Sequence, residues 1–277
     1  MAGFDEWLCE RLMNRYMRRN RALGEHVAVY AWDYIGLQVM LYGTYEGVFL
    51  DAATAFLKEN GIDTGGTYLD IGANIGNHAL YFSRHARRVL AFEPNPKVYR
   101  LLSLNASGRY IETFNFGLSD ANGMLSFEVN AANLGEARVV RAPSVPECAE
   151  TIEVRRYDDI EALRDVKVDV MKVDVEFHEH AVFTGCREMI ARCKPAIIFE
   201  QMAEEVSGGT SRTVELLRSY GYRFYYYGHA VDFPKGIRGF GALVMGLLGQ
   251  RERFRPLVAM RRKAYNIVAL PTARPGR

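Results

Sequence analysis

The sequence has few cysteines, and their spacing argues against two common roles. The 277 residues include four, namely Cys9, Cys148, Cys186 and Cys193. None forms a Cys-x-x-Cys pair, and no group of histidines and cysteines has the spacing of a zinc site. We therefore expect no disulfide scaffold and no structural zinc, but the reduced cysteines of a cytoplasmic protein.

Long hydrophobic runs are also missing. The most apolar stretch, residues 240–248, is too short to span a bilayer, and the first residues lack the apolar segment of a secretory signal. An excess of one charge is absent too, because the formal net charge is only +2. Net charge thus gives no reason to expect a nucleic-acid partner, and we expect a soluble, cytoplasmic protein.

The sequence does have enough apolar residues for a large core. Hydrophobic residues make up 49% and charged residues 25%, as in ordinary globular proteins. From residue 61 onward, short apolar runs alternate with segments of helical periodicity. Strands are predicted at 67–71, 89–92, 113–116, 168–175 and 195–199, and helices at 77–86, 96–106 and 179–192. This alternation predicts an α/β fold with a mostly parallel sheet.

The remaining segments complete the predicted organisation. Residues 1–60, with helices at 4–23 and 46–59, form an N-terminal helical segment on the substrate side, and residues 61–272 form the main domain. Strands at 124–129 and 151–155 flank a predicted loop at 131–149. A helix at 213–219 and strands at 222–227 and 266–270 follow, with a basic and apolar insertion at 230–264.

The strongest motif is Asp70-Ile71-Gly72-Ala73-Asn74-Ile75-Gly76, which leaves a strand and enters a helix. Glycines let the backbone turn sharply and approach a ligand closely, and the helix start offers free N–H groups. Glu93 ends the next strand, about 20 residues on, where a carboxylate can accept both hydroxyls of an adenosine ribose. A glycine pair alone would indicate only a tight turn, but together with Glu93 it favours cofactor binding.

The glycine spacing also bears on which cofactor binds. Dinucleotide enzymes place a glycine where this chain has Asn74, so that a pyrophosphate can reach the helix start. The motif therefore suits an adenosine ligand without phosphate, such as S-adenosylmethionine, whose ammonium group Asp70 could attract. A nicotinamide-dependent oxidoreductase is the alternative enzyme, disfavoured by Asn74 and by the absence of a suitably placed Tyr-x-x-x-Lys pair.

Taken together, these motifs resemble the FkbM family of S-adenosylmethionine-dependent methyltransferases. The resemblance covers roughly residues 42–201 and, more weakly, 265–271. It rests on residues 43–46, 70–76, 92–94, 117–120, 171–176 and 195–200. It implies a Rossmann-like methyltransferase fold, with a mostly parallel seven-stranded sheet covered by helices on both faces. It also implies O-methylation, often of sugar or polyketide hydroxyls.

The resemblance assigns roles to the residues after the first three strands. Asp70, Gly72, Asn74 and Gly76 would line the methionine side of the cofactor, and Glu93 would hold the ribose. Contacts with adenine would come from Leu118, Ser119 and Asp120. For Asp120, a turn before Asn122-Gly123 is an equally good interpretation.

Catalytic candidates follow the fourth predicted strand. Asp174 should lie beside the transferred methyl group, because ligands of open α/β sheets bind at the carboxyl ends of strands. A base assists a hydroxyl nucleophile, so Asp174, His178 and His180 are candidates, although each histidine could instead be an exposed residue at a helix start. Phe177 stands where the family usually has glycine, and phenylalanine disfavours a positive φ.

Three glutamates are assigned to the acceptor side, namely Glu46, Glu176 and Glu200. With Asp174 they could also hold a divalent cation, but their spacing does not require one, and separate contacts are the better interpretation. The acceptor is expected to be a small molecule, a glycan or a lipid-linked compound. A domain that binds the cofactor or a membrane without turnover is the non-enzyme alternative, which only Phe177 encourages.

Basic residues gather near both ends of the chain. Five arginines lie on the N-terminal helix, namely Arg11, Arg15, Arg18, Arg19 and Arg21. Eight basic residues lie in 235–263, namely Lys235, Arg238, Arg251, Arg253, Arg255, Arg261, Arg262 and Lys263. Basic residues beside apolar ones are typical of a surface that contacts an anionic membrane or partner. A solvated face with a homo-oligomer contact is an equal alternative.

Overall fold

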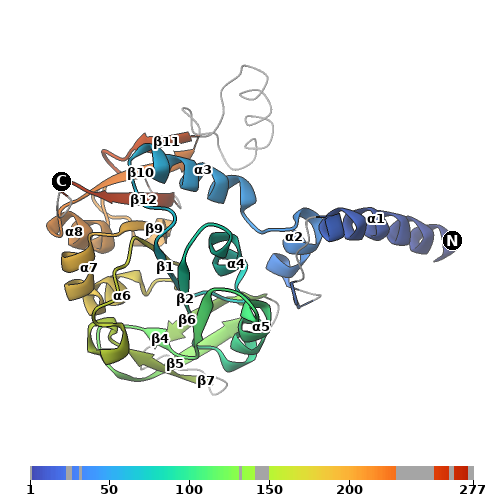
Figure 1. The fold of residues 1–277 in the computed structure, drawn as a ribbon, viewed down its shortest axis with the longest axis horizontal. Helices are drawn as coiled ribbons and strands as arrows, with labels where there is room; N and C mark the ends of the chain where they lie inside the picture. Colours follow the sequence, from blue (N-terminus) through green and yellow to red (C-terminus); the bar gives the residue numbers. More distant parts are fainter. Residues whose placement is uncertain are drawn as a thin grey trace.

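The computed structural model describes residues 2–22, 27–30, 33–130, 133–140, 150–228, 253–261 and 265–273. Its centre is an eight-stranded sheet in the order β11-β10-β12-β9-β8-β1-β2-β3 (Figure 1). The strands are β1 Thr67–Ile71, β2 Arg88–Phe92, β3 Ile111–Phe114, β8 Val170–Val173, β9 Ala196–Gln201, β10 Tyr222–Gly228, β11 Arg253–Pro256 and β12 Tyr265–Pro271.

Five of these strands form a parallel core, and the order of their pairing locates a switch point. From β1 the chain moves outward to β2 and β3, and later returns to place β8 on the other side of β1. β12 inserts antiparallel between β9 and β10. The order of the strands along the sheet reverses between β1 and β8, and open α/β sheets bind ligands at such a point.

The mostly parallel sheet is confirmed, but the expected number of seven strands is wrong. The eighth strand, β11, lies inside the predicted insertion at 230–264 and pairs antiparallel with β10. An edge strand in a basic segment gives little hydrophobic alternation, so its pattern was not recognisable. The rest of that insertion, 230–252 and 262–264, lies outside the described residues.

Helices cover both faces of the sheet, as predicted (Figure 1). One core joins the sheet to α3 Gly47–Glu59, α4 Asn77–Ser83 and α5 Pro96–Ala106. The other joins it to α6 Glu179–Gly185, α7 Arg187–Cys193 and α8 Arg212–Ser219. β1 shows the alternation that produces two cores, because Tyr68 packs into the first and Leu69 into the second. The expected helix at 179–192 is two helices, which meet at the buried Cys186.

A second, four-stranded sheet lies beside the carboxyl ends of the central strands, in the order β4-β7-β5-β6. Its strands are β4 Gly117–Leu118, β5 Gly123–Asn130, β6 Asn133–Val140 and β7 Glu150–Arg155. The prediction of a loop over 131–149 is therefore wrong for 133–140, where pairing with β5 overrides local composition. Phe127, Ile152 and Val154 form the small core of this sheet.

The N-terminal segment is helical, with α1 Ala2–Ala22 and α2 Tyr34–Tyr42 preceding α3. Asp33 caps α2 by accepting a hydrogen bond from the Gly36 N–H. α1 projects away from the rest of the molecule (Figure 1). Although α3 was placed in the N-terminal segment, its buried Leu50 and Leu57 pack into the core of the main sheet.

Short 3-10 helices complete the description, at η1 Tyr157–Asp159, η2 Glu161–Leu163 and η3 Ala203–Glu205. Some of the predicted features cannot be compared with the structure. Cys148, the side chains of Arg19 and Arg21, and the basic residues Lys235, Arg238, Arg251, Arg262 and Lys263 lie outside the described residues. Among the described helices, none is both long enough and apolar enough to cross a membrane.

Candidate functional site

A cavity of about 300 Å³ lies at the carboxyl ends of β1, β2, β8 and β9. Its walls come from three parts of the chain. The main sheet supplies the turns after its strands, the smaller sheet supplies Phe127, Ile152 and Val154, and α2 supplies Tyr34 and Ile35. The cavity is thus located where the strand order of the sheet reverses.

The turn after β1 approaches β8 too closely for a side chain. Gly72 has a φ of +78°, and a Cβ added there would lie 1.9 Å from the carbonyl oxygen of Asp174. Gly76 also has a positive φ and precedes α4. Asn74 adopts the left-handed conformation that asparagine tolerates, and its Oδ1 accepts a hydrogen bond from the Ile75 N–H, 2.7 Å away.

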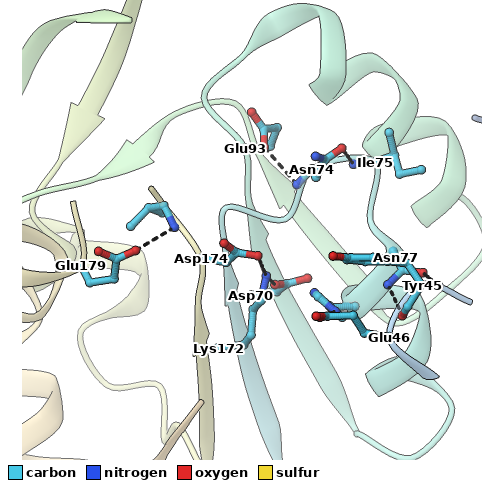
Figure 2. Close-up of polar contacts among 12 residues, drawn as sticks. Tyr45, Glu46, Asp70, Asn74, Ile75, Asn77, Glu93, Lys172, Asp174 and Glu179 are labelled. Carbon is cyan, nitrogen blue, oxygen red and sulfur yellow. Dashed lines mark hydrogen bonds and ion pairs between the residues drawn. The ribbon is translucent and has the colours of Figure 1, made fainter. Parts of the chain in front are cut away.

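Glu93 fastens this turn to the end of β2. Its Oε2 accepts a hydrogen bond from the Asn74 N–H at 3.0 Å (Figure 2). Its Oε1 accepts one from the Asn95 N–H at 2.8 Å. Burial raises the pKa of this carboxyl to about 7, against the lowering effect of the two N–H donors. Each carboxylate oxygen keeps further acceptor capacity for a ligand hydroxyl.

Lys172 lies between two aspartates at the centre of the site. Its Nζ is 3.0 Å from Asp174 Oδ2 and 3.8 Å from Asp70 Oδ1. Burial opposes a positive charge on Lys172, but the two carboxylates outweigh it and raise the pKa of the amine. Burial likewise opposes the charge of Asp174, yet Lys172 outweighs it and lowers the pKa of that carboxyl.

Asp70 is completely buried, and neither of its carboxylate oxygens has a hydrogen-bond partner among the described residues. A buried carboxylate without hydrogen bonds is costly, and the Lys172 amine at 3.8 Å compensates only part of this cost. Such a group is suited to receive a donor from a ligand, and the ammonium of a bound amino acid moiety is one.

The segment before α3 is clamped onto the start of α4. The Asn77 side chain accepts from the Tyr45 N–H at 2.9 Å and donates to the Tyr45 carbonyl at 3.0 Å. The next residues along each segment also meet, since Glu46 Oε2 lies 3.3 Å from His78 Nε2. Glu46 holds a positive φ of 57° in this position. Non-glycine residues held in this region concentrate at functional sites.

The part of the cavity near the ends of β8 and β9 is rich in carboxylates. Burial, together with Asp174, Glu46 and Glu176, raises the pKa of Glu200 to about 7. Burial and the nearby Glu46 also raise the pKa of the Tyr45 hydroxyl. Lys172 is the only lysine or arginine among the described residues that line the cavity. No three His, Cys, Asp or Glu side chains in the described ranges are arranged to hold a metal ion.

On the opposite side, Leu118 and His178 line the cavity. His178 precedes α6 and is buried, and its Nε2 lies 2.9 Å from Ser119 Oγ. Ser119 in turn donates a hydrogen bond to Asp120, which is exposed. The structure thus places Leu118 at the cavity, Ser119 one contact away from it, and Asp120 outside it.

The residues after β8 differ in where they point. Glu176 lines the cavity, whereas His180 lines a separate open hollow with Glu205 and Arg212. Phe177 adopts a φ of +66° and is 43% exposed, so the chain keeps here the backbone conformation that glycine would favour. Glu179 is buried, and this burial is the main reason why its pKa is raised to about 8. Its carboxylate accepts a hydrogen bond from the Val175 N–H.

Four contributors to the site were not predicted as site residues, namely Lys172, Tyr45, Asn77 and His78. For Lys172 the sequence holds one indication of a functional role, because a charged residue stands inside an apolar strand segment. Asn77 and His78 directly follow Gly76, but nothing in the sequence shows that residues 45 and 46 pack against them. Of the predicted cofactor and acceptor residues, Asp70, Gly76, Ser119 and Asp120 line neither the main cavity nor the adjoining small one, whereas all the others line one of them.

Comparison with known proteins identifies a family whose model matches this chain. The model of the methyltransferase FkbM domain matches residues 70–224. A solved structure of a methyltransferase FkbM from Methylobacillus flagellatus KT is similar, with 17% identity and a TM-score of 0.43. The similarity covers 74% of this chain and 44% of that chain.

Two further comparisons are more distant or shorter. Magnesium protoporphyrin IX methyltransferase from Synechocystis PCC 6803, solved with S-adenosylmethionine bound, is 10% identical with a TM-score of 0.43, covering 98% of this chain and 92% of that one. The AMB antimetabolite synthetase AmbE of Pseudomonas aeruginosa is 50% identical over 58 residues, or 19% of this chain. The chain spans only 3% of the length of that synthetase.

Proposed function

The chain belongs to the FkbM methyltransferase family, and we propose that it uses S-adenosylmethionine to methylate a hydroxyl group of a sugar, a glycolipid or a secondary metabolite. Membership of this family supports a methyltransferase that depends on S-adenosylmethionine. The hydroxyl acceptor and the residue roles below are proposals. The observation that carries them is the turn between β1 and α4, which Glu93 holds beside the buried Asp70, whose oxygens accept no hydrogen bond from the part of the chain that the structure describes.

The cavity has the groups that this cofactor needs. Asp70 is buried directly before Ile71 and Gly72, which line the cavity, and we assign its two oxygens, which accept no hydrogen bond within the described ranges, to the amino group of the methionine moiety. The close approach at Gly72 leaves room for a ligand but not for a side chain. Glu93 has remaining lone pairs for the ribose hydroxyls, and Leu118 offers an apolar contact for adenine.

The same turn disfavours a dinucleotide. A pyrophosphate needs free backbone N–H groups at the helix start. Here the Asn74 N–H donates to Glu93 and the Ile75 N–H donates to the side chain of Asn74. Two of the donors that would hold a pyrophosphate are therefore occupied.

When bound, the cofactor supplies an electrophilic methyl group for an in-line displacement at carbon. The acceptor oxygen forms the new bond to this carbon, the bond from carbon to sulfur breaks, and the hydroxyl proton passes to the protein. Holding the two reactants in line is a large part of the catalysis. We assign this orientation to the carboxylate side of the cavity, with Glu46, Glu176 and Glu200 as contacts for acceptor hydroxyls.

For the proton acceptor, position and pKa favour different residues. Asp174 lies at the end of β8, beside the expected methyl group, but Lys172 lowers its pKa and makes it a weak base. Glu200 has a pKa of about 7 and lines the same cavity. A general base works best when its pKa is near the working pH. We keep Asp174 as the predicted base and name Glu200 and the His78–Glu46 pair as its competitors.

Two measurements test the proposed function in order. Calorimetry with S-adenosylhomocysteine should show binding to the purified chain, and absence of binding would remove the cofactor assignment. Mass spectrometry of host glycans, lipids and small metabolites should then show a product that lacks one methyl group when the gene is deleted. A methyl group lost from nitrogen or carbon instead of oxygen would contradict the hydroxyl acceptor while leaving the methyltransferase itself intact.

A further inference from the structure

Helix α1 has two faces with different surroundings. Met13, Tyr16 and Met17 line a large groove of about 1270 Å³, which residues 27–29 and parts of α2, α3 and α5 also line. This face of α1 therefore turns toward the body of the molecule. The opposite face of α1 contributes no described residue to this groove. The helix as a whole projects from the rest of the molecule (Figure 1).

The outward face consists of six side chains at intervals of three and four residues, which place them on one stripe of a helix. They are Phe4, Trp7, Leu8, Arg11, Arg15 and Arg18. We call this stripe the α1 outer face.

Aromatic and basic groups are combined on the α1 outer face. The side chains of Phe4, Trp7 and Leu8 are 64%, 49% and 39% exposed. The rings of Phe4 and Trp7 stack with centroids 5.9 Å apart, and Arg11 Cζ lies 5.2 Å from the Trp7 centroid. Large apolar side chains that gather on a surface mark an interaction site more often than single exposed ones do.

The charge of this face narrows the choice of partner. It carries three arginines. Of the acidic residues of α1, Asp5 and Glu10 lie at the two edges of the stripe and Glu6 lies farther round the helix, so none is among the six side chains of the face. The α1 outer face is therefore both apolar and positively charged, with no carboxylate of its own to neutralise it.

We propose that the α1 outer face binds the surface of a membrane that contains anionic lipids. Trp and Phe side chains partition into the region of lipid headgroups. Arginine forms paired hydrogen bonds with phosphate and extends its charged end to the headgroups while its stem stays among apolar groups. An amphipathic helix lying in the interface needs only to bury its apolar side, so no membrane-spanning segment is required.

A second copy of the chain fits this face poorly. A two-fold axis places the same patch of both subunits against each other. In a parallel pairing the arginines of the two copies would face each other, and in an antiparallel pairing they would face Phe4, Trp7 and Leu8, so neither arrangement gives them a carboxylate of the face to pair with. This docking does not depend on the proposed function, because it rests on α1 alone.

The test uses the full chain and vesicles of two compositions. We expect sedimentation with vesicles of phosphatidylcholine mixed with phosphatidylglycerol at low salt, and little sedimentation with phosphatidylcholine alone. High salt should weaken the binding, because it screens exposed charges. In a chain carrying Trp32→Phe, the fluorescence emission of Trp7 should shift to shorter wavelength when anionic vesicles are added.

Variants separate this face from net charge. Replacing Arg11, Arg15 and Arg18 with Gln should lower the partition coefficient by about fivefold for each arginine. The matched control replaces Arg100, Arg187 and Arg212, which are exposed elsewhere, and should bind as the unchanged chain does. Phe4→Ala with Trp7→Ala should weaken binding at any salt concentration.

Three results would overturn the proposal. One is an unchanged chain that stays in the supernatant with anionic vesicles at low salt. Another is equal loss of binding in the two arginine triples, which would assign it to net charge. The third is a dimer in light scattering that Trp7→Ala dissociates, which would show that the α1 outer face binds a second copy.

Discussion

The carboxylate of Glu93 accepts a hydrogen bond from the backbone N–H of Asn74, 3.0 Å away, and so joins the end of β2 to the turn after β1. The residue proposed to hold the ribose therefore also shapes the turn that faces the methionine moiety. Changes at Glu93 should act on both parts of the cofactor site.

Replacing Glu93 with Ala should weaken the binding of S-adenosylhomocysteine by about 1.5–3 kcal/mol, the scale of hydrogen bonds to a charged group. Calorimetry measures the effect. Glu112→Ala is a control, since this exposed glutamate on β3 pairs with Arg88, away from the cavity. Equal affinity of Glu93→Ala and the unchanged chain would remove Glu93 from the cofactor site.

Asp174→Asn should slow methyl transfer by about 10²–10⁴-fold while cofactor affinity changes little, if Asp174 takes the acceptor proton. Single-turnover rates with the acceptor found by mass spectrometry provide the measurement. Glu200→Gln, compared over a pH series, identifies the competing base. Because the pKa of Glu200 is about 7, loss of a rate increase near neutral pH in that variant alone would transfer the role from Asp174 to Glu200.

Gly72→Ala should be much more damaging than Gly108→Ala. Both glycines have a positive φ, +78° and +73°, but only at Gly72 would the new Cβ meet another atom, the Asp174 carbonyl at 1.9 Å. The backbone penalty alone is about 1–2 kcal/mol, and overpacking adds about 1–3 kcal/mol. Urea denaturation of the two variants measures the difference, and equal stabilities would mean that β8 can move away from the turn without cost.

At position 177, glycine should be better tolerated than alanine. Phe177 has a φ of +66° and an exposed ring, so both variants lose the same few contacts. Glycine relieves a backbone cost of about 1–2 kcal/mol but adds about 0.5–1 kcal/mol of unfolded-state entropy. Phe177→Gly should therefore unfold at higher urea concentration than Phe177→Ala. The reverse order would show that the ring or the backbone at 177 is not strained.

Glu179→Gln should flatten the dependence of stability on pH. The folded-state pKa of Glu179 is raised to about 8 from 4.5, mainly by burial. Between these values the folded protein holds a proton that the unfolded chain has lost, so stability falls as pH rises through this window. Denaturation at pH values inside and below the window tests this, with Glu161→Gln as an exposed control. Parallel curves for both variants would contradict a buried, protonated Glu179.

Hydrophobic periodicity was sufficient to predict the layered α/β fold, and the glycine motif was sufficient to predict residues that the structure places at one end of the cavity. Asp70, Gly72 and Glu93 could be placed because the ends of neighbouring parallel strands meet at one sheet edge. The features that were missed depend on tertiary contacts. β11 and β6 are strands because their neighbours provide hydrogen bonds. The helix break at Cys186 has one local signal, Gly185 at the end of α6, and a single glycine inside a helical pattern does not by itself mark a break.

The acceptor side was harder to predict for a different reason. Glu46 was assigned to it, but its contact with His78 depends on the clamp between Asn77 and the backbone of Tyr45. Such packing between distant segments leaves no periodic signal in either of them. The position of His180, in a hollow away from the cavity, follows from the positive φ values of Glu176 and Phe177, which redirect the chain before α6.

The return of the chain from β3 to β8 has a consequence for synthesis on the ribosome. Asp70 and Glu93 emerge early, but Lys172, Asp174 and Glu200 follow only after the smaller sheet has been made. Pairing of β1 with β8 is a contact of long sequence separation, a kind that forms slowly. A nascent chain that ends before β8 lacks Lys172, the counter-charge of Asp70, and one that ends before β9 lacks the wall of the cavity that contains Glu200. Stabilisation by a ligand therefore begins only once β9 has left the exit tunnel.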